Sequence, residues 1–453
     1  MKTSTIGFYG GTGSVTGANF LLDIGTARIL IDCGLEQGGE FAADSNRAAF
    51  QYDPHTIDAL VVTHAHADHI GRIPKLVKDG FKGAIYSTSP TKDLAAIMLR
   101  DACSIMQYES SKDGVEPLFA ESHIDQALAL WKTHSYHEAF SIVDVSVTLY
   151  DAGHILGSAL VVFEREGRKL MCTGDIGNVP QPLLNPPEKV EDLNYILMES
   201  VYGNRLHEQV VDRTELLKNE IERTIAQKGT LIIPAFSLER TQGMLFEINN
   251  FVESGEVPAI PVFLDSPLAI AVTDIYRGHR AYLKDSVRAQ IEQGDDIFDF
   301  PKLKMTATRQ ASDEIYKTPG PKIIIAGSGM SHGGRVLSHE IAYLGRPDTT
   351  LLLVGYQTVG SVGRLLQDGV KKVTIDNVPV HVRARIAMIQ GYSGHADRDQ
   401  LIDFVAERGQ HAEKVFVTMG EERASLFLVQ RLRDYLGMDA IAPEADQVIP
   451  IDL

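Results

Sequence analysis

The sequence predicts an α/β protein with two domains. Its 453 residues are too many for a single hydrophobic core, and a hydrophobic content of 44% is ordinary for a globular chain. Short strands separated by glycine-rich turns dominate the first part, and a regular alternation of helix and strand begins after Tyr202. Such alternation is typical of an α/β domain.

The first part contains most of the predicted strands. Runs of apolar residues bounded by turn residues predict strands at 6–9, 19–23, 28–32, 57–63, 146–151, 159–164, 169–173 and 195–199. Apolar residues at helical spacing predict helices over about 90–111 and 122–132. The residues that suggest chemistry follow the ends of these strands.

The second part alternates between the two kinds of element. Helices are predicted over about 212–227 and 241–252, and strands at 230–234, 262–265, 322–326, 350–354, 373–375 and 380–389. The chain then returns to sequence that is rich in acid and histidine motifs.

Composition bears on the partners and the cellular location. The formal net charge of −17 argues by itself against a nucleic-acid partner, since phosphate contacts come from Lys and Arg, although bound dications add positive charge that this count omits. The cysteines Cys33, Cys103 and Cys172 are too few and too widely spaced for a disulfide framework or a cysteine zinc site. Without an apolar run of membrane or signal-peptide type, we expect a cytoplasmic protein that does not bind membranes.

One short motif directly follows the apolar run 57–63. It reads His64-x-His66-x-Asp68-His69. Imidazole and carboxylate groups suit an ion such as zinc, and a strand that ends in a tight loop aims alternate side chains at one point. A single histidine is more often a solvated or satisfied side chain, but this cluster predicts a metal site.

Four more ligand-type residues stand at predicted strand ends, where a rigid scaffold holds the side chain and a loop leaves room for substrate. They are Asp32, His154, Asp175 and His395, each next to glycine or within two residues of it. Taken singly, a Gly-Asp or Gly-His pair is more often a turn. Their conjunction with the histidine cluster makes the case for a shared site.

The order of these motifs resembles that of a known family. Asp32, the motif at 64–69, His154 and Asp175 resemble the metallo-β-lactamase superfamily. The stretch 198–203, with its acid at Glu199, resembles motif A of the β-CASP nucleases, and 393–395 resembles their motif B. The chain is similar to bacterial and archaeal relatives of the endonuclease subunit of the cleavage and polyadenylation specificity factor.

The resemblance implies a fold and a set of site residues. It implies an αββα metallo-β-lactamase sandwich formed by residues 1–206 and 375–453, with an α/β β-CASP cap domain inserted at 207–374. Of the predicted metal ligands, one zinc takes His64, His66 and His154, the other takes Asp68 and His69, and Asp175 bridges the two. Asp32 is expected behind the ligands, as an acceptor that orients an imidazole.

Met419 departs from the RNA-processing branch of the family. That branch has a histidine ligand for the second metal where this chain has Met419, within 417–421. A thioether is a poor zinc ligand beside imidazole and carboxylate, so we expect the second zinc to be held less tightly or completed by water. The DNA-processing branch also lacks this histidine, which supports a DNA substrate, whereas the settings of Glu199 and His395 favour RNA.

The predicted function is hydrolysis of phosphodiester bonds in single-stranded RNA, as an endonuclease or exonuclease of RNA processing or decay. Metal-bound hydroxide is the expected nucleophile, and His395, held by Glu199, is the expected general acid toward the leaving 3′ oxygen. The predicted catalytic residues are Asp68, Glu199 and His395.

Substrate contacts are expected from four further residues, which are Arg240, Ser266, Gly329 and Arg335. A guanidinium fork suits phosphate, yet it suits a carboxylate equally, so a salt-bridged arginine remains an alternative for both arginines. Glycine-rich turns near Gly329 would let backbone amides approach a phosphate, and His332 lies in the same region.

Three other functions remain open, and so does self-association as a homodimer. A DNA nuclease of the same family is favoured by Met419 and opposed by the settings of Glu199 and His395. A small-molecule metallohydrolase needs neither Glu199 nor the stretch 393–395, and this chain has both. A weakly active partner subunit is favoured by the loss of the motif C histidine at Met419 but opposed by the intact ligand set.

Overall fold

The computed structural model describes residues 4–38, 42–207, 210–331, 333–355, 357, 360–389, 391–409 and 412–453. The chain forms two compact units. The terminal unit comprises Met1–Val179, Asn185–Leu206 and His395–Leu453, and the inserted unit comprises Pro180–Leu184 and His207–Gly394.

The terminal unit contains two seven-stranded sheets. In spatial order, the first sheet is β22 (Val448–Ile451), β1 (Ser4–Phe8), β2 (Phe20–Asp23), β3 (Arg28–Ile31), β4 (Ala59–Val61), β5 (Ala84–Ser87) and β6 (Trp131–Thr133). The second sheet is β21 (Ala440–Ile441), β20 (Lys414–Val417), β11 (Tyr195–Met198), β10 (Arg168–Cys172), β9 (Ala159–Arg165), β8 (Val145–Asp151) and β7 (Phe140–Ile142). Strands from both ends of the chain therefore complete each sheet.

The main core of the terminal unit lies between these sheets. Alternate residues of β8 are buried, so Val145, Val147 and Leu149 face the other sheet. The rings of Phe8 and Phe416, one from each sheet, lie 5.5 Å apart. Burial of each such large apolar side chain stabilises the fold by about 1.5–3 kcal/mol.

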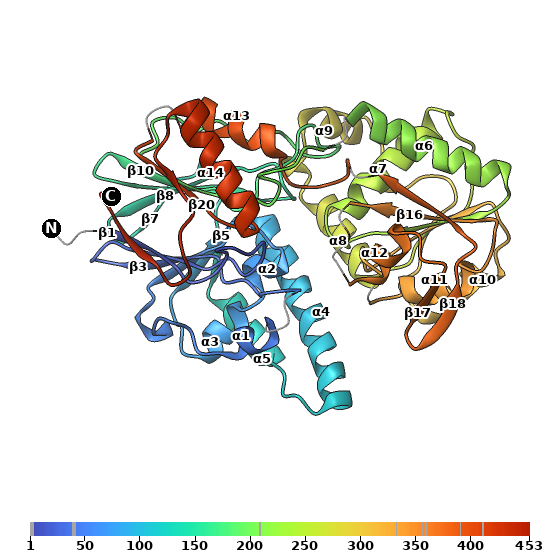
Figure 1. The fold of residues 1–453 in the computed structure, drawn as a ribbon, viewed down its shortest axis with the longest axis horizontal. Coiled ribbons are helices and arrows are strands. Elements are labelled where there is room, and N and C mark those ends of the chain that lie inside the picture. Colours follow the sequence, from blue (N-terminus) through green and yellow to red (C-terminus); the bar gives the residue numbers. More distant parts are fainter. Residues whose placement is uncertain are drawn as a thin grey trace. The chain divides into compact units, whose positions relative to one another are not determined.

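Helices cover the outer faces of both sheets. On the second sheet, α13 (Arg398–Arg408) and α14 (Glu422–Leu436) bury Leu401, Phe404 and Leu428 against strand residues such as Met171 and Ile196. Below the first sheet in Figure 1 lie α1 (Ala42–Arg47), α3 (Ile73–Lys78), α4 (Ser89–Asp113) and α5 (Glu121–Ala129). The layer order is αββα, which confirms the predicted fold class.

The inserted unit is built on a six-stranded parallel sheet. The strand order is β14 (Leu303–Met305), β13 (Val262–Leu264), β15 (Lys322–Ala326), β12 (Thr230–Pro234), β16 (Thr349–Val354) and β19 (Arg385–Ile389). Every residue of β12, β15 and β16 is buried, as expected for central strands covered on both faces.

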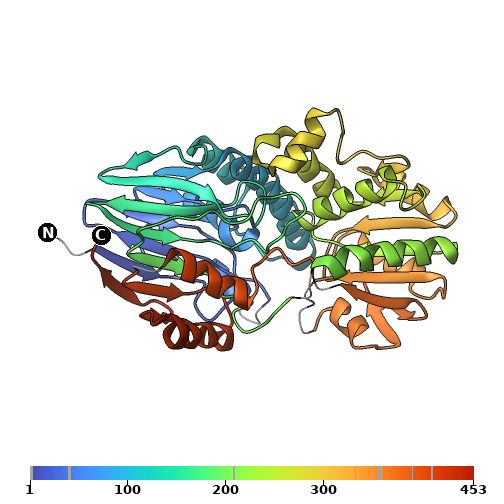
Figure 2. The same cartoon turned by 90° about the horizontal axis from the view of Figure 1, so that it is seen from above.

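Helices lie on both sides of this parallel sheet. Figure 1 shows α6 (Val210–Ala226) on one side of β16, with α10 (Arg309–Lys317) and α11 (Val336–Tyr343) on the other, and Figure 2 shows the strands side by side with α6 along one face. The remaining helices are α7 (Arg240–Glu253), α8 (Pro267–Gly278), α9 (Asp285–Glu292) and α12 (Val362–Gln367). Within the described residues, no helix is both long and apolar enough to cross a membrane.

Three details differ from the sequence-based expectations. The helix expected over 122–132 ends at Ala129, because residues 131–133 pair with β5 as an edge strand. The strand expected at 380–389 is two strands, β18 (Val378–His381), which pairs with β17 (Lys372–Ile375), and β19. Since β19 pairs with β16, the inserted unit extends to Gly394, beyond the expected boundary at 374/375.

Candidate metal centre and active site

The predicted metal ligands follow the ends of strands in the terminal unit. His64 and His66 come after β4, His154 comes after β8, and Asp175 comes after β10. The helix α2 (Ala67–Ile70) begins directly after His66 and carries Asp68 and His69. Because β4 belongs to the first sheet and β8 and β10 to the second, the fold brings both sheets' loops to one place.

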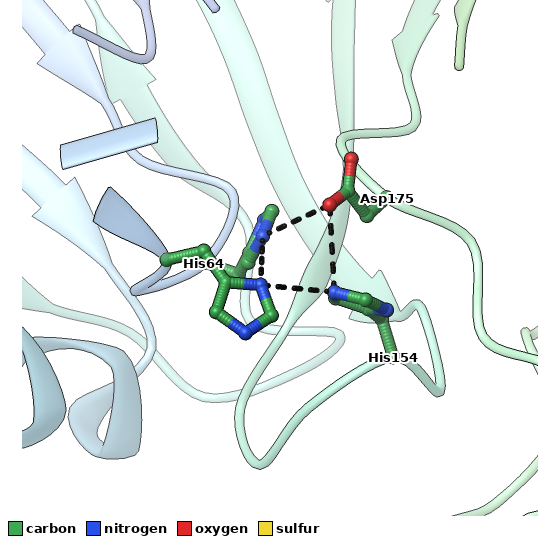
Figure 3. A group of neighbouring side chains, drawn as sticks. His64, His154 and Asp175 are labelled. Carbon is green, nitrogen blue, oxygen red and sulfur yellow. Dashed lines mark hydrogen bonds and ion pairs between the residues drawn. The ribbon is translucent and has the colours of Figure 1, made fainter. Parts of the chain in front are cut away.

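Four ligand atoms converge on one point (Figure 3). His66 Nδ1 is 3.1 Å from both His64 Nε2 and His154 Nε2. Asp175 Oδ2 is 3.3 Å from His64 Nε2 and 3.4 Å from His154 Nε2. Two ligand atoms of one zinc, each at about 2.0–2.1 Å from the ion, lie about 3–4 Å apart. All four ligand atoms here lie within 4.8 Å of one another, so this donor set fits a single zinc. We call these four residues the first ligand group.

The electrostatics of the first ligand group also suit a cation. Burial lowers the pKa of His64, and burial together with the neighbouring imidazoles holds the pKa of His66 well below its ordinary value. The neutral imidazole is the form of histidine that binds zinc, so these lowered pKa values keep the ring nitrogens available as ligands.

A second ligand group shares Asp175 and adds Asp68 and His69. His69 Nε2 lies 3.3 Å from Asp175 Oδ1 and 3.8 Å from Asp68 Oδ2. His69 Nε2 and Asp175 Oδ1 are buried, and neither has a hydrogen-bond partner. Burial lowers the pKa of His69, but the surrounding carboxylates outweigh it and raise the pKa well above its usual range. Unsatisfied buried atoms in a negative potential fit a second cation.

Asp32 holds the imidazole of His69 from behind. Its carboxylate lies directly after β3 and accepts a hydrogen bond from the backbone N–H of Thr63 at 2.8 Å and from the Thr63 hydroxyl at 2.7 Å. Asp32 Oδ2 is also 2.7 Å from His69 Nδ1. With Nδ1 bonded to Asp32, Nε2 of His69 faces Asp68 and Asp175, which supports the predicted orienting role of Asp32.

Thr63 is a residue that the sequence reasoning missed. Its hydroxyl lies 3.1 Å from His64 Nδ1 and 3.4 Å from His69 Nδ1, so it contacts one member of each ligand group. Its position in the sequence could have identified it, because Thr63 is the polar residue between the apolar strand and the histidine motif.

His395 and Glu199 form a pair beside the first ligand group. Glu199 follows β11 and is fully buried, and its Oε1 is 3.2 Å from His395 Nδ1. The same oxygen accepts the backbone N–H of Ile176 at 2.6 Å. Asp175 Oδ2 is 3.8 Å from His395 Nδ1. Burial lowers the pKa of His395, but the carboxylates of Glu199 and Asp175 outweigh this and raise it to about 9.

Met419 lies next to the second ligand group but belongs to the hydrophobic core. Only 2% of it is exposed, and it packs in the cluster between the two sheets. Its backbone N–H donates to Gly11 O at 2.6 Å, and a small cavity is lined by Asp32, Thr63, His69 and Met419. A thioether side chain, from a residue that follows β20, therefore lines this cavity together with His69.

The two predicted substrate-binding arginines are engaged within the inserted unit. Arg240, the first residue of α7, donates from Nε to Tyr392 O at 3.2 Å and from Nη1 to Val354 O at 3.1 Å. Arg335 donates from Nη1 to Asp265 Oδ1 at 2.7 Å and from Nη2 to Ala307 O at 3.0 Å. Both guanidinium groups thus bind protein oxygens, the alternative that the sequence left open, and their contact with substrate stays a prediction.

Ser266 and Gly329, the other predicted substrate contacts, lie in turns of the same unit. The Ser266 hydroxyl accepts the backbone N–H of Ala269 at 3.2 Å as the N-cap of α8 and is 3.3 Å from the Ser237 hydroxyl. A side chain at Gly329 would collide with Phe236, since an added Cβ would lie 2.6 Å from its ring. His332 lies outside the described residues.

Family models match three parts of the chain. A Metallo-beta-lactamase superfamily domain matches residues 21–186, a Beta-Casp domain matches 241–366, and a Zn-dependent metallo-hydrolase RNA specificity domain matches 379–443. A solved structure of a protein of unknown function from Enterococcus faecalis has the same fold, with a TM-score of 0.61 at 14% identity over 99% of this chain and 100% of that one.

Curated relatives cover nearly the whole chain. A ribonuclease of Thermus thermophilus is 35% identical over 93% of this chain and 94% of its own length. Transcription termination factor FttA of Methanosarcina mazei is 32% identical over 96% of this chain and 69% of its own. An RNase J-like protein of Methanocaldococcus jannaschii is 30% identical over 98% and 99%. The chain therefore belongs to the β-CASP family of the metallo-β-lactamase superfamily.

Proposed function

We propose that this protein is a metal-dependent ribonuclease that hydrolyses phosphodiester bonds in single-stranded RNA. One observation carries the proposal: Asp175 Oδ2 lies 3.3 Å from the ligand atom of His64 and 3.8 Å from His395 Nδ1, so a proton-donating pair adjoins the metal ligands. Phosphodiester hydrolysis needs such an acid for its leaving alkoxide. The names of the relatives and of the RNA specificity domain support RNA as the substrate.

Zinc is the ion that we assign to these ligands. His64, His66, His154 and Asp175 would hold one zinc, while Asp68, His69 and the other oxygen of Asp175 would hold a second, more weakly bound one. Bound there, zinc lowers the pKa of a coordinated water toward neutrality and offsets the negative charge that develops on the phosphate.

The protein's own contribution is the proton for the leaving group. His395 donates to the 3′ oxygen as the phosphodiester bond breaks, and Glu199 stabilises the imidazolium form through its contact with Nδ1. Backbone N–H groups fix Glu199 in turn, since its oxygens accept from Ile176 at 2.6 Å and Val201 at 3.3 Å. Asp68, with a side chain that is 19% exposed, is the carboxylate of the second ligand group most accessible to solvent and substrate.

The test combines metal analysis with cleavage of end-labelled single-stranded RNA and DNA. We expect His395→Ala to keep its metal and lose about 100-fold or more of the RNA cleavage rate, as general acid catalysis contributes about 10²–10⁴-fold. We expect Asp68→Ala to lose both second-site metal and cleavage. The control His55→Ala removes a histidine that is 64% exposed and should change neither.

Two outcomes would redirect the proposal. Unchanged RNA cleavage in both His395→Ala and Asp68→Ala would overturn the nuclease mechanism. Cleavage of DNA in preference to RNA by the wild-type protein would replace the substrate class and keep the mechanism.

A further inference from the structure

The four residues before His395 are held by side chains of the inserted unit. Arg213 of α6 donates from Nη1 to Gly391 O at 2.9 Å, and Arg240 of α7 donates to Tyr392 O at 3.2 Å. Gln181 Nε2 donates to Gly394 O at 3.4 Å. Three of the four backbone carbonyls in this segment are thus bound by donors from three separate parts of the unit.

The side chain of Tyr392 is anchored as well. Its hydroxyl donates to Glu247 Oε2, and Glu247 Oε1 lies 3.7 Å from Arg213 Nη2. The Arg213 guanidinium in turn lies 5.1 Å from the centroid of the Tyr392 ring. Each pair among these three residues is in contact, and all three are at least nine-tenths buried. Removal of one member would leave a buried polar or charged group without its partner.

The helix α7 supplies two of the contacts from one face. Arg240 and Glu247 are seven residues apart, which places them two turns apart on the same side of the helix. Gly355, with a φ of +86°, leaves room for the Arg240 guanidinium, because a Cβ there would lie 3.0 Å from its central carbon. Glycine at position 355 therefore leaves the space in which Arg240 reaches the segment.

We propose that Arg213, Glu247 and Tyr392 form a buried latch that fixes the segment Gly391–Gly394, and that they are positioning residues for His395. The segment contains two glycines, which are free to sample many backbone conformations unless contacts restrict them. Gly394 is bonded directly to His395, so freedom in this segment becomes freedom of the imidazole. A displacement of about 1 Å in a catalytic group can reduce a rate about 100-fold. The functional part of this inference rests on the proposed role of His395 as general acid.

Tyr392→Phe tests the latch, because it removes only the hydroxyl. We expect kcat for RNA cleavage to fall about tenfold with KM and metal content unchanged, since the metal ligands belong to the terminal unit. The matched control is Tyr343→Phe. Tyr343 is another buried tyrosine of the inserted unit, and its hydroxyl accepts from Lys322 Nζ at 2.8 Å without contacting this segment. The control should lose comparable stability and keep its kcat.

Two further measurements separate positioning from general destabilisation. In a His395→Ala background, Tyr392→Phe should cause no further loss, because its effect passes through His395. Amide hydrogen exchange in the peptide 391–397 should rise in Tyr392→Phe and not in Tyr343→Phe. Glu247→Gln keeps an acceptor for the hydroxyl and should retain more activity than Glu247→Leu.

The outcomes distinguish the latch from the proposed function. A kcat for Tyr392→Phe equal to that of Tyr343→Phe, or a loss that multiplies with that of His395→Ala, would overturn the positioning role. Unchanged exchange in 391–397 would overturn the latch itself, whether or not His395 is catalytic. Wild-type cleavage by His395→Ala, with exchange raised in Tyr392→Phe, would instead contradict the proposed function and leave a structural latch.

Discussion

The two ligand groups that share Asp175 differ in the number of ligand atoms that the chain supplies and in the distances between these atoms. In the first group, His66 Nδ1 and Asp175 Oδ2 each lie 3.1–3.4 Å from the Nε2 atoms of both His64 and His154. In the second, His69 Nε2 is 3.3 Å from Asp175 but 3.8 Å from Asp68, and the next strand end contributes Met419. Asp175 thus belongs to a group of four close ligand atoms through Oδ2 and to a more open group through Oδ1.

The largest expected effect comes from a break in the first ligand group. His154→Ala removes one of its four donors and should abolish tight metal binding at that site, with RNA cleavage falling by more than about 100-fold, beyond the 10–100-fold typical of residues behind a ligand. Metal content after gel filtration and cleavage rates measure this. The exposed His55→Ala serves as the control, and full metal content in His154→Ala would contradict the assignment of four donors to this site.

Stepwise metal removal should separate the two groups in the wild-type protein. A weak chelator should remove one equivalent of metal and a strong chelator the second, because the second ligand group is incomplete. Loss of the tightly held ion should lower the free energy of unfolding by about 2.7 kcal/mol when free metal is about 100 times the Kd. Thermal unfolding monitored at each step checks this, and simultaneous release of both metals would contradict the difference between the groups.

Asp32→Asn should affect the second group more than the first. Asp32 bonds His69 Nδ1 at 2.7 Å, whereas its link to His64 passes through the Thr63 hydroxyl. An amide in place of the carboxylate weakens the orientation of His69, and we expect about 10–100-fold lower affinity for the second metal. Competition titrations with a metal indicator measure each affinity, and an equal loss at both groups would show that Asp32 supports the site as a whole.

The residues of the first ligand group could be predicted from the sequence because short local motifs identify them. His64 and His66 share one motif, and His154 and Asp175 each lie within three residues of the end of a predicted strand, where a loop must turn. Ligand-type residues at several strand ends favour one shared site, so these residues were expected together before the fold was known. The αββα layers followed from the family resemblance that the same motifs carry.

The hydrogen-bond partners of Arg240 and Arg335 could not be predicted, because they are distant in the sequence. Arg240 bonds Tyr392, 152 residues away, and Arg335 bonds Asp265, 70 residues away. A guanidinium fork fits a carbonyl, a carboxylate or a phosphate, and only tertiary structure selects among them. The latch could not be predicted for the same reason. Glu247 lies 145 residues from Tyr392, and Arg213 lies 178 residues from Gly391.

The smallest effect on metal binding is expected from substitution of Met419. This substitution also tests the difference between the two ligand groups most directly. Its side chain packs in the core beside Gly11, where an added Cβ would lie 2.5 Å from the Met419 sulfur, so the space is shaped for a long thioether. Met419→His adds an imidazole beside His69 and should raise the occupancy of the second metal a few-fold at limiting zinc. Metal content and RNA cleavage at graded zinc concentrations measure this.

Met419→Leu is the matched control for that substitution. It conserves volume without adding a donor, should cost less than about 1.5 kcal/mol, and should leave metal content unchanged. If the wild-type protein already holds two metals that resist weak chelation, and Met419→His adds nothing to them, then the second ligand group is complete without a ligand at position 419. Asp68, His69 and Asp175 would then suffice for tight binding, and the asymmetry between the two sides of Asp175 would be one of geometry alone.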